Sequence, residues 1–383
     1  MPTSPVFQPF AVEQFLSENE QKPELNFSES GVHPMTLGEL MDVARIDMQA
    51  LAATALDYPE VNGTRGLREV IAGLYEKAHA DEVLVTVGAS EANQLVSGTL
   101  LMPGDEAIAF RPTYQQLPGQ ALNRGITVKT VNLIEDRGWQ LDRAALDEAV
   151  TSNTRLIHIV NPNNPTGHIL TPEERDAIIA AAARVGAWIV ADEVYAGTER
   201  DREAPTESFW GEYNKVIAIN SMSKAYGLPG LRLGWLVAPR TIVPDLWRRH
   251  EYTTISATML ANRLAEAALA PAARVKIVAR ARRLIRRGFT SLSAGLGEHP
   301  GVFSVVPPQA SAMSFVRFDL PLGSGELAGR LLEEQRMLVI PGHCFGLDDH
   351  IRFSSALPEN YLARGLERLN ALVAQLQQTS DSG

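Results

Sequence analysis

An amine that could react with an aldehyde stands at Lys224, directly after an apolar run. Residues 216–219 read Val-Ile-Ala-Ile and predict a buried strand, and Ser221 follows them. Arg232 comes eight residues after the lysine, beyond a turn rich in glycine and proline. A lysine in surroundings that favour the neutral amine can form a Schiff base. The Ser221 hydroxyl and the Arg232 guanidinium can bind phosphate. Together these groups predict a site for pyridoxal 5'-phosphate (PLP), which carries an aldehyde and a phosphate on one ring.

A carboxylate and a phenol follow another apolar run upstream. Residues 188–191 predict a buried strand, which leads into Asp192 and, three positions later, Tyr195. A carboxylate beside the pyridine nitrogen keeps that nitrogen protonated and makes the ring an electron sink. A phenol can hydrogen bond the ring hydroxyl. An isolated aspartate after a strand is usually a helix cap, and an isolated lysine is usually a solvated surface charge. The prediction therefore depends on finding these groups together.

Two further segments place polar groups after predicted strands. Residues 161–167 read Asn-Pro-Asn-Asn-Pro-Thr-Gly after the strand predicted at 156–160, and two prolines with a glycine indicate a rigid loop. An asparagine amide there can donate to the ring hydroxyl and to a substrate carboxylate. After the strand predicted at 83–87, Ala89 and Ser90 begin a helix, whose free N–H groups could hold a phosphate. Many α/β connections share that second pattern.

The order of predicted elements indicates an α/β fold. Strands at 83–87, 107–110, 126–131 and 156–160 alternate with helices, among them one at 142–150. Such alternation is typical of a mostly parallel sheet with helices on both faces. Ligands of such sheets bind at the carboxyl ends of the strands. The candidate groups all follow such ends, and this agreement is stronger than any single residue.

These motifs, in this order, resemble those of the class I/II aminotransferases, the fold-type I PLP enzymes, over about residues 26–355. The resemblance implies a large PLP-binding domain at residues 46–283 and a small α/β domain built from residues 1–45 and 284–383. It implies a homodimer with active sites at the interface, and transfer of an amino group between an amino acid and a 2-oxo acid through a Lys224 Schiff base. Lys224 would also serve as general base and acid.

The resemblance also implies roles for particular residues. Asn164 would bind the ring hydroxyl and the substrate carboxylate, and Tyr114 would stack on the pyridine ring. Tyr58 lies in a Tyr-x-x-x-x-Gly-x-x-x-Leu-Arg element, whose tyrosine reaches the phosphate of the neighbouring subunit. Gly31 would bring backbone close to the substrate carboxylate, and Arg352 would bind that carboxylate through paired donors. Each of the last four residues also has a simpler interpretation. Tyr114 could be a core tyrosine and Tyr58 a packed loop aromatic. Gly31 could be a turn glycine and Arg352 a surface arginine.

A narrower resemblance leaves a second function open. Residues 30–33 and 223–232 look like those of the capreomycidine synthases, PLP enzymes that cyclise a hydroxylated arginine. The chain departs from them by keeping Asn-Asn-Pro-Thr-Gly and Asp-Glu-Val-Tyr, which favours transamination. The alternative is a PLP-dependent lyase or cyclase acting on a β-hydroxylated arginine-like amino acid, with His33 as candidate acid. A loop histidine without a catalytic role is the simpler interpretation.

Composition limits the other possibilities. The chain has 383 residues, 45% of them hydrophobic, which is enough for a large core and two domains. A net charge of -10 argues against a nucleic-acid partner. One cysteine, Cys344, fits a reducing compartment. No signal peptide or membrane span is evident, so we expect a cytoplasmic protein that does not bind membranes. A non-catalytic PLP sensor would need a DNA-binding module, for which the N-terminal segment has no room.

Two local expectations can be compared directly with the structure. Thr36 and Glu39 have the spacing of a capping box, which predicts one helix from there to about residue 50. The arginine-rich run at residues 280–283 is most simply a solvated helix face.

Overall fold

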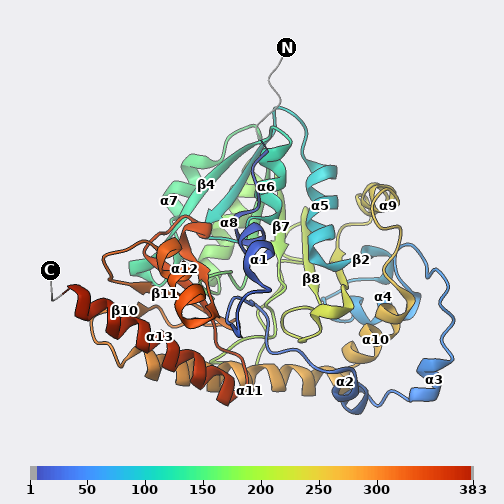
Figure 1. The fold of residues 1–383 in the computed structure, drawn as a ribbon. Helices are drawn as coiled ribbons and strands as arrows, with labels where there is room; N and C mark the ends of the chain where they lie inside the picture. Colours follow the sequence, from blue (N-terminus) through green and yellow to red (C-terminus); the bar gives the residue numbers. More distant parts are fainter. Residues whose placement is uncertain (1–6, 381–383) are drawn as a thin grey trace.

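An eight-stranded sheet forms the centre of the molecule, which a computed structural model describes for residues 7–380 (Figure 1). The strand order is β2-β9-β8-β7-β6-β3-β4-β5. The strands are β2 (Val83–Thr86), β3 (Glu106–Arg111), β4 (Thr127–Ile134), β5 (Gln140–Leu141), β6 (Thr154–Val160), β7 (Trp188–Asp192), β8 (Val216–Ser221) and β9 (Gly234–Val237).

The sheet is mixed but mostly parallel. The neighbours β4, β3, β6, β7 and β8 pair in parallel, whereas β9 runs antiparallel to both β8 and β2. The carboxyl ends of β2, β3, β6, β7 and β8 therefore lie along one edge, together with the start of β9. The predicted α/β fold is confirmed, because helices flank a mostly parallel sheet. The segments that carry Ala89, Tyr114, Asn164, Asp192 and Lys224 leave the sheet at this edge, whereas Arg352 belongs to a second, smaller sheet.

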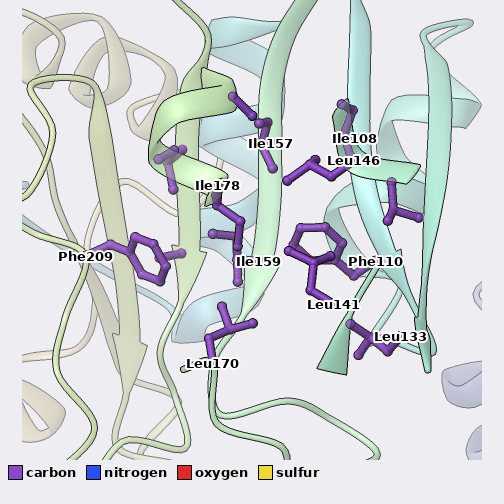
Figure 2. Close-up of a cluster of buried hydrophobic side chains, with 14 of the residues drawn as sticks. Ile108, Phe110, Leu133, Leu141, Leu146, Ile157, Ile159, Leu170, Ile178 and Phe209 are labelled. Atoms are coloured by element: carbon purple, nitrogen blue, oxygen red, sulfur yellow. The ribbon is translucent and has the colours of Figure 1, made fainter. Parts of the chain in front are cut away.

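Helices cover both faces of this sheet because side chains alternate along each strand. Ile108 and Phe110 of β3 point to one face, where they pack with Ile178 of α8 (Pro172–Val185) in the cluster shown in Figure 2. Ala107 points to the opposite face and packs in a cluster with Leu95 of α5 (Gly88–Leu100).

The remaining helices connect or cover these strands. They are α1 (Ala11–Asn19), α2 (Leu37–Ala44), α3 (Met48–Ala52), α4 (Arg65–Ala72), α6 (Gln116–Asn123), α7 (Arg143–Ala149), α9 (Val243–His250), α10 (Met259–Leu269), α11 (Pro271–Leu296), α12 (Ser324–Gln335) and α13 (Glu359–Ser380). Short 3-10 turns are η1 (Ala80–Glu82), η2 (Glu135–Arg137), η3 (Pro229–Leu231) and η4 (Gly342–Phe345). Figure 1 shows the long helices α11 and α13 side by side.

A smaller sheet is built from the C-terminal part of the chain. Its order is β10-β11-β14-β13, with strands β10 (Phe303–Val305), β11 (Met313–Phe318), β13 (Ile340–Pro341) and β14 (His350–Ser354). The N-terminal strand β1 (Leu25–Asn26) pairs with β12 (Met337–Leu338), and Phe27 packs in a cluster with Phe353 and Leu369. Both chain ends thus share one core. The division into residues 46–283 and residues 1–45 with 284–383 stays a prediction, and the continuous helix α11 crosses its boundary at residue 283.

Two local expectations need correction. The capping box at Thr36 and Glu39 is present, but α2 ends at Ala44. Arg45 adopts a left-handed conformation with φ 55°, and Asp47 caps a separate helix, α3, by accepting from the Ala50 amide. The run at residues 280–283 is not simply solvated, because Arg282 is buried and pairs with the buried Glu199. A local break in the backbone decides the first case, and a tertiary contact, which local spacing does not encode, decides the second.

Within residues 7–380, no helix is both long and apolar enough to span a membrane.

Candidate active site

A cavity of about 360 Å³ opens at the carboxyl ends of the central strands. Most of the predicted site residues line it, although they come from distant parts of the chain. They are Ala89, Ser90, Tyr114, Asn164, Asp192, Tyr195, Ser221, Lys224, Arg232 and Arg352. Segments of α1 and the stretch 28–30 close the other side. Gly31 and Tyr58 do not line this cavity.

Lys224 reaches the cavity from the loop after β8. Its Nζ donates a hydrogen bond of 2.7 Å to Oγ of Ser30. Burial lowers the pKa of the Lys224 amine, while nearby carboxylates, chiefly that of Glu29, oppose the shift. A lysine with a lowered pKa presents more of the neutral amine, which is the form that attacks an aldehyde or accepts a proton.

Asp192 ends β7 beneath the cavity, with 4% of its surface exposed. Nδ2 of Asn93 donates to its Oδ2 at 3.1 Å, and the Val194 amide donates to its Oδ1 at 3.3 Å. Burial raises the pKa of Asp192 to about 6, against the effect of these hydrogen bonds and of Lys224. The carboxylate is therefore short of compensating positive charge, and a cationic ring nitrogen would supply it.

Arg352, Asn164 and Tyr195 form a chain of hydrogen bonds across the cavity. Nη1 of Arg352 donates to Oδ1 of Asn164 at 3.1 Å, and Nδ2 of Asn164 donates to the Tyr195 hydroxyl at 3.1 Å. Nη2 of Arg352 donates to the Ser28 carbonyl at 2.5 Å, whereas its Nε is buried without a partner. Burial raises the pKa of Tyr195, and the Arg352 charge and a hydrogen bond from Ser30 offset part of that rise.

A cradle for an anion lies where α5 begins. Gly88 has φ +75°, and a Cβ there would lie 2.8 Å from Nη2 of Arg232, so a side chain would displace the guanidinium. Ala89 and Ser90 follow in the first turn of α5, where backbone N–H groups lack helical partners. Ser221 lines the same side. These donors match a phosphate.

Comparison with known proteins settles the family. Residues 32–369 match the model of the "Aminotransferase class I and II" family. The chain belongs to that family. It is 30% identical to a capreomycidine synthase from Streptomyces vinaceus, over 94% of this chain and 92% of that protein. It is 29% identical to an aspartate aminotransferase from Streptomyces avermitilis, over 77% and 75%. A PLP-dependent aminotransferase structure from Streptococcus suis superposes with a TM-score of 0.91 and 30% identity, covering 97% of this chain and 98% of that one.

This class I and II aminotransferase uses PLP, as its family does, and its own residues fit that group. The Gly88 cradle with Arg232 suits the phosphate, and the undercompensated Asp192 suits a protonated ring nitrogen. Asn164 and Tyr195 offer donors for the ring hydroxyl. The unpaired Nε of Arg352 remains for a substrate carboxylate.

The other predicted residues lie in different settings. Tyr114 lines the cavity, and its hydroxyl donates to Oε1 of Glu13 at 2.6 Å. Gly31 lies behind Lys224, where a Cβ would approach the Ser223 carbonyl to 3.0 Å. It lines an adjoining cavity of about 330 Å³. Tyr58 is 85% exposed, so it takes no part in the cavity of its own chain.

Sequence reasoning did not find Ser30, Asn93 or the glutamates of the cavity. Asn93 lies four positions after Ala89, on the same face of α5, so helical spacing could have indicated it. Ser30 precedes Gly31 but carries no spacing signal toward Lys224, which is 194 positions away. Its contact depends on how the N-terminal segment crosses the strand ends.

Proposed function

We propose that the enzyme moves an amino group between an amino acid and a 2-oxo acid, with Lys224 as the proton-transferring group. The main observation behind this proposal is that Lys224, Asp192 and Arg352 line one cavity, and that Nε of Arg352 has no hydrogen-bond partner there. The likeness to aminotransferases over most of the chain supports it. The two substrates are small molecules, and neither nucleic acid nor membrane has a role in the proposal.

The protein's residues have two tasks in this proposal, which are to bind the cofactor and substrate and to transfer a proton. When bound, PLP supplies an aldehyde for the substrate amino group and a ring that accepts electrons from Cα. Ser221, Arg232 and the start of α5 would hold the phosphate, and Asp192 would pair with the ring nitrogen. Arg352 would orient the substrate through its α-carboxylate. Lys224, with its pKa lowered by burial, takes the proton from Cα and later returns one.

A second candidate is a PLP-dependent lyase or cyclase reaction on a β-hydroxylated arginine-like substrate. The 30% identity to a capreomycidine synthase favours it. His33 and Gly31 line the adjoining cavity of about 330 Å³, which Lys224 also lines. A histidine there could protonate a departing β-hydroxyl. Burial and the charge of Arg280 lower the pKa of His33, so at neutral pH this acid would be mostly unprotonated, and transamination remains the better-supported function.

The assembly and compartment are also proposals. A homodimer would give the exposed Tyr58 a function, because it could complete the phosphate site of the other subunit. A cytoplasmic location would fit the single cysteine, Cys344, which is buried and unpaired.

A panel of amino acids tests the reaction type. Holoenzyme mixed with a true amino donor should release the matching 2-oxo acid in an amount equal to the enzyme. Continued turnover should require a second 2-oxo acid. Release of ammonia or water from a β-hydroxylated substrate, with no need for a second 2-oxo acid, would establish the lyase or cyclase function instead.

A further inference from the structure

Three glutamates line the active-site cavity without a part in the proposed chemistry. Among the described residues that line it, every cationic side chain has a proposed role, and so does Asp192. Lys224 serves the amino group, Arg232 the phosphate and Arg352 the α-carboxylate. The carboxylates left over belong to Glu13, Glu20 and Glu29, which we call the acidic rim. All three are solvent-exposed as well as lining the cavity.

Glu29 lies between the two positions that contact the cavity's cations. The Ser28 carbonyl accepts from Arg352, and the Ser30 hydroxyl accepts from Lys224. Burial lowers the pKa of both the lysine and the arginine, and the Glu29 charge opposes each shift. The Glu29 side chain also lines the adjoining cavity of about 330 Å³. Its field therefore reaches the space on both sides of Lys224.

The other two members of the rim belong to α1, the blue helix at the centre of Figure 1. Glu13 lies in the first turn, and Glu20 is the C-cap residue directly after Asn19. They are seven positions apart, which is about two helical turns, so they face the same side. The Glu13 charge also acts on Lys224 and Arg352.

Arg352 provides an independent indication of how a ligand lies. It is 2% exposed and lines the cavity, and its Nε has no hydrogen-bond partner. A buried guanidinium N–H without a partner is costly, so the site is built to receive an acceptor such as a carboxylate. With the α-carboxylate at Arg352 and the amino group toward Lys224, the substrate side chain must use the remaining lining, which includes the acidic rim.

We infer that the acidic rim selects an amino-acid substrate with a cationic side chain, a guanidinium or an ammonium. This inference rests on the proposed reaction and adds the substrate class to it. Carboxylates complement such a group in charge and, for guanidinium, in planar hydrogen-bond geometry. A second carboxylate, as in aspartate or glutamate, would instead meet like charge, because no described cation on the cavity remains free to bind it.

The sharpest probe is a substrate pair that differs only in charge. Arginine and citrulline have nearly the same shape, but the citrulline side chain is a neutral urea. Exposed ion pairs contribute up to ~1 kcal/mol each, a factor of about five. Three carboxylates of intermediate strength should therefore give a kcat/KM for arginine about tenfold above that for citrulline. The ratio should shrink as salt is raised.

Substitution of the rim assigns the effect to named residues. Glu29→Gln should lower the arginine-to-citrulline ratio about twofold, and a double variant with Glu20→Gln should bring it to about two, with Glu13 still present. Glu18→Gln is the matched control, since Glu18 lies on α1, accepts from Gln14 and does not line the cavity. Its ratio should stay within about twofold of the wild type. An unchanged ratio in the double variant would overturn the inference.

A binding measurement separates this inference from the reaction itself. Desaminoarginine and desaminocitrulline lack the amino group and cannot be transaminated, so their affinity for the holoenzyme reports side-chain selection alone. Tighter binding of desaminoarginine by about tenfold supports the inference, even if no amino acid is transaminated and the proposed function fails. Equal binding of the two, or a higher kcat/KM for glutamate than for arginine, would contradict it.

Discussion

The sheet side of the cavity is buried and closely hydrogen bonded, whereas the side formed by α1 and residues 28–30 carries exposed charges. We call the first the sheet wall, and it comprises Asn164, Asp192, Tyr195, Ser221 and Lys224. Asp192 and Asn164 are only 4% and 2% exposed, while the acidic rim is open to solvent. A buried wall fixes the cofactor and its chemistry, since each polar group there must have a partner. An open rim can change without unfolding the protein and is suited to choosing a substrate.

Lys224→Ala on the sheet wall should have the largest effect. Turnover should fall by about 10³-fold or more, because no other lysine among the described residues lines the cavity to bind the aldehyde and move the proton. The visible absorbance that depends on the lysine-bound cofactor should also disappear. A variant that keeps this absorbance would show that Lys224 does not bind the cofactor.

Asp192→Asn should lower activity but raise the stability of the cofactor-free enzyme at neutral pH. Turnover should fall at least about 10²-fold, as expected when a preorganised charge is lost. The raised pKa of Asp192, about 6, means that the folded state binds a proton more tightly than the unfolded state. In the cofactor-free enzyme, its contribution to stability is therefore full below about pH 4 and is lost as pH rises through about 6.

Chemical unfolding of the cofactor-free proteins at several pH values would measure this difference. The wild type should lose roughly 1–3 kcal/mol relative to Asp192→Asn between about pH 4 and pH 8. The neighbouring Glu193, whose pKa burial raises to about 7, is present in both proteins and cancels in the comparison. Parallel stability curves would mean that Asp192 is charged without cost in the folded state.

Ser30→Ala tests whether the N-terminal segment contributes to catalysis as well as to selection. Loss of the 2.7 Å hydrogen bond from Lys224 should lower kcat roughly tenfold, because a hydrogen bond to a charged group contributes at least about 1.5 kcal/mol. The cofactor should remain bound. Ser30→Thr, which keeps a hydroxyl, is the control and should recover part of kcat. Equal loss in both variants would indicate a packing role.

Mixed dimers test whether Tyr58 belongs to the other subunit's site. Chains with Tyr58→Phe and chains with Lys224→Ala are each impaired, but random exchange makes half of the dimers mixed. One site of a mixed dimer would lack both changes, so about a quarter of wild-type activity should return. If subunit exchange is confirmed and no activity is regained, the shared site is wrong.

His33→Ala should have the smallest effect if the enzyme is a transaminase. We expect half-transamination of accepted amino acids to stay within about tenfold, or ~1.4 kcal/mol of barrier. The side chain lines the adjoining cavity and not the one that holds Lys224, Asp192 and Arg352 together. A much larger loss, confined to elimination from a β-hydroxylated substrate, would favour the cyclase function.

The sequence by itself indicated the family and the central strands that carry the candidate groups, although the strand predicted at 126–131 extends to residue 134. The strand predicted at 188–191 is β7, and that at 216–219 lies in β8, so Asp192 and Lys224 could be placed at one sheet edge before any contact was known. These predictions succeeded because strands and turns are specified by apolar patterns and turn residues within a few positions of the sequence. The helix predicted from Thr36 to residue 50 failed, because a left-handed Arg45 divides it.

Only the tertiary structure decided the other side of the cavity. It brought Ser30 to Lys224, buried Arg282 against Glu199 and left Nε of Arg352 without a partner. It also turned α1 so that Glu13 and the capping Glu20 line the cavity. No local pattern encodes these contacts, because they join segments far apart in the chain and depend on how the two chain ends pack together on the sheet.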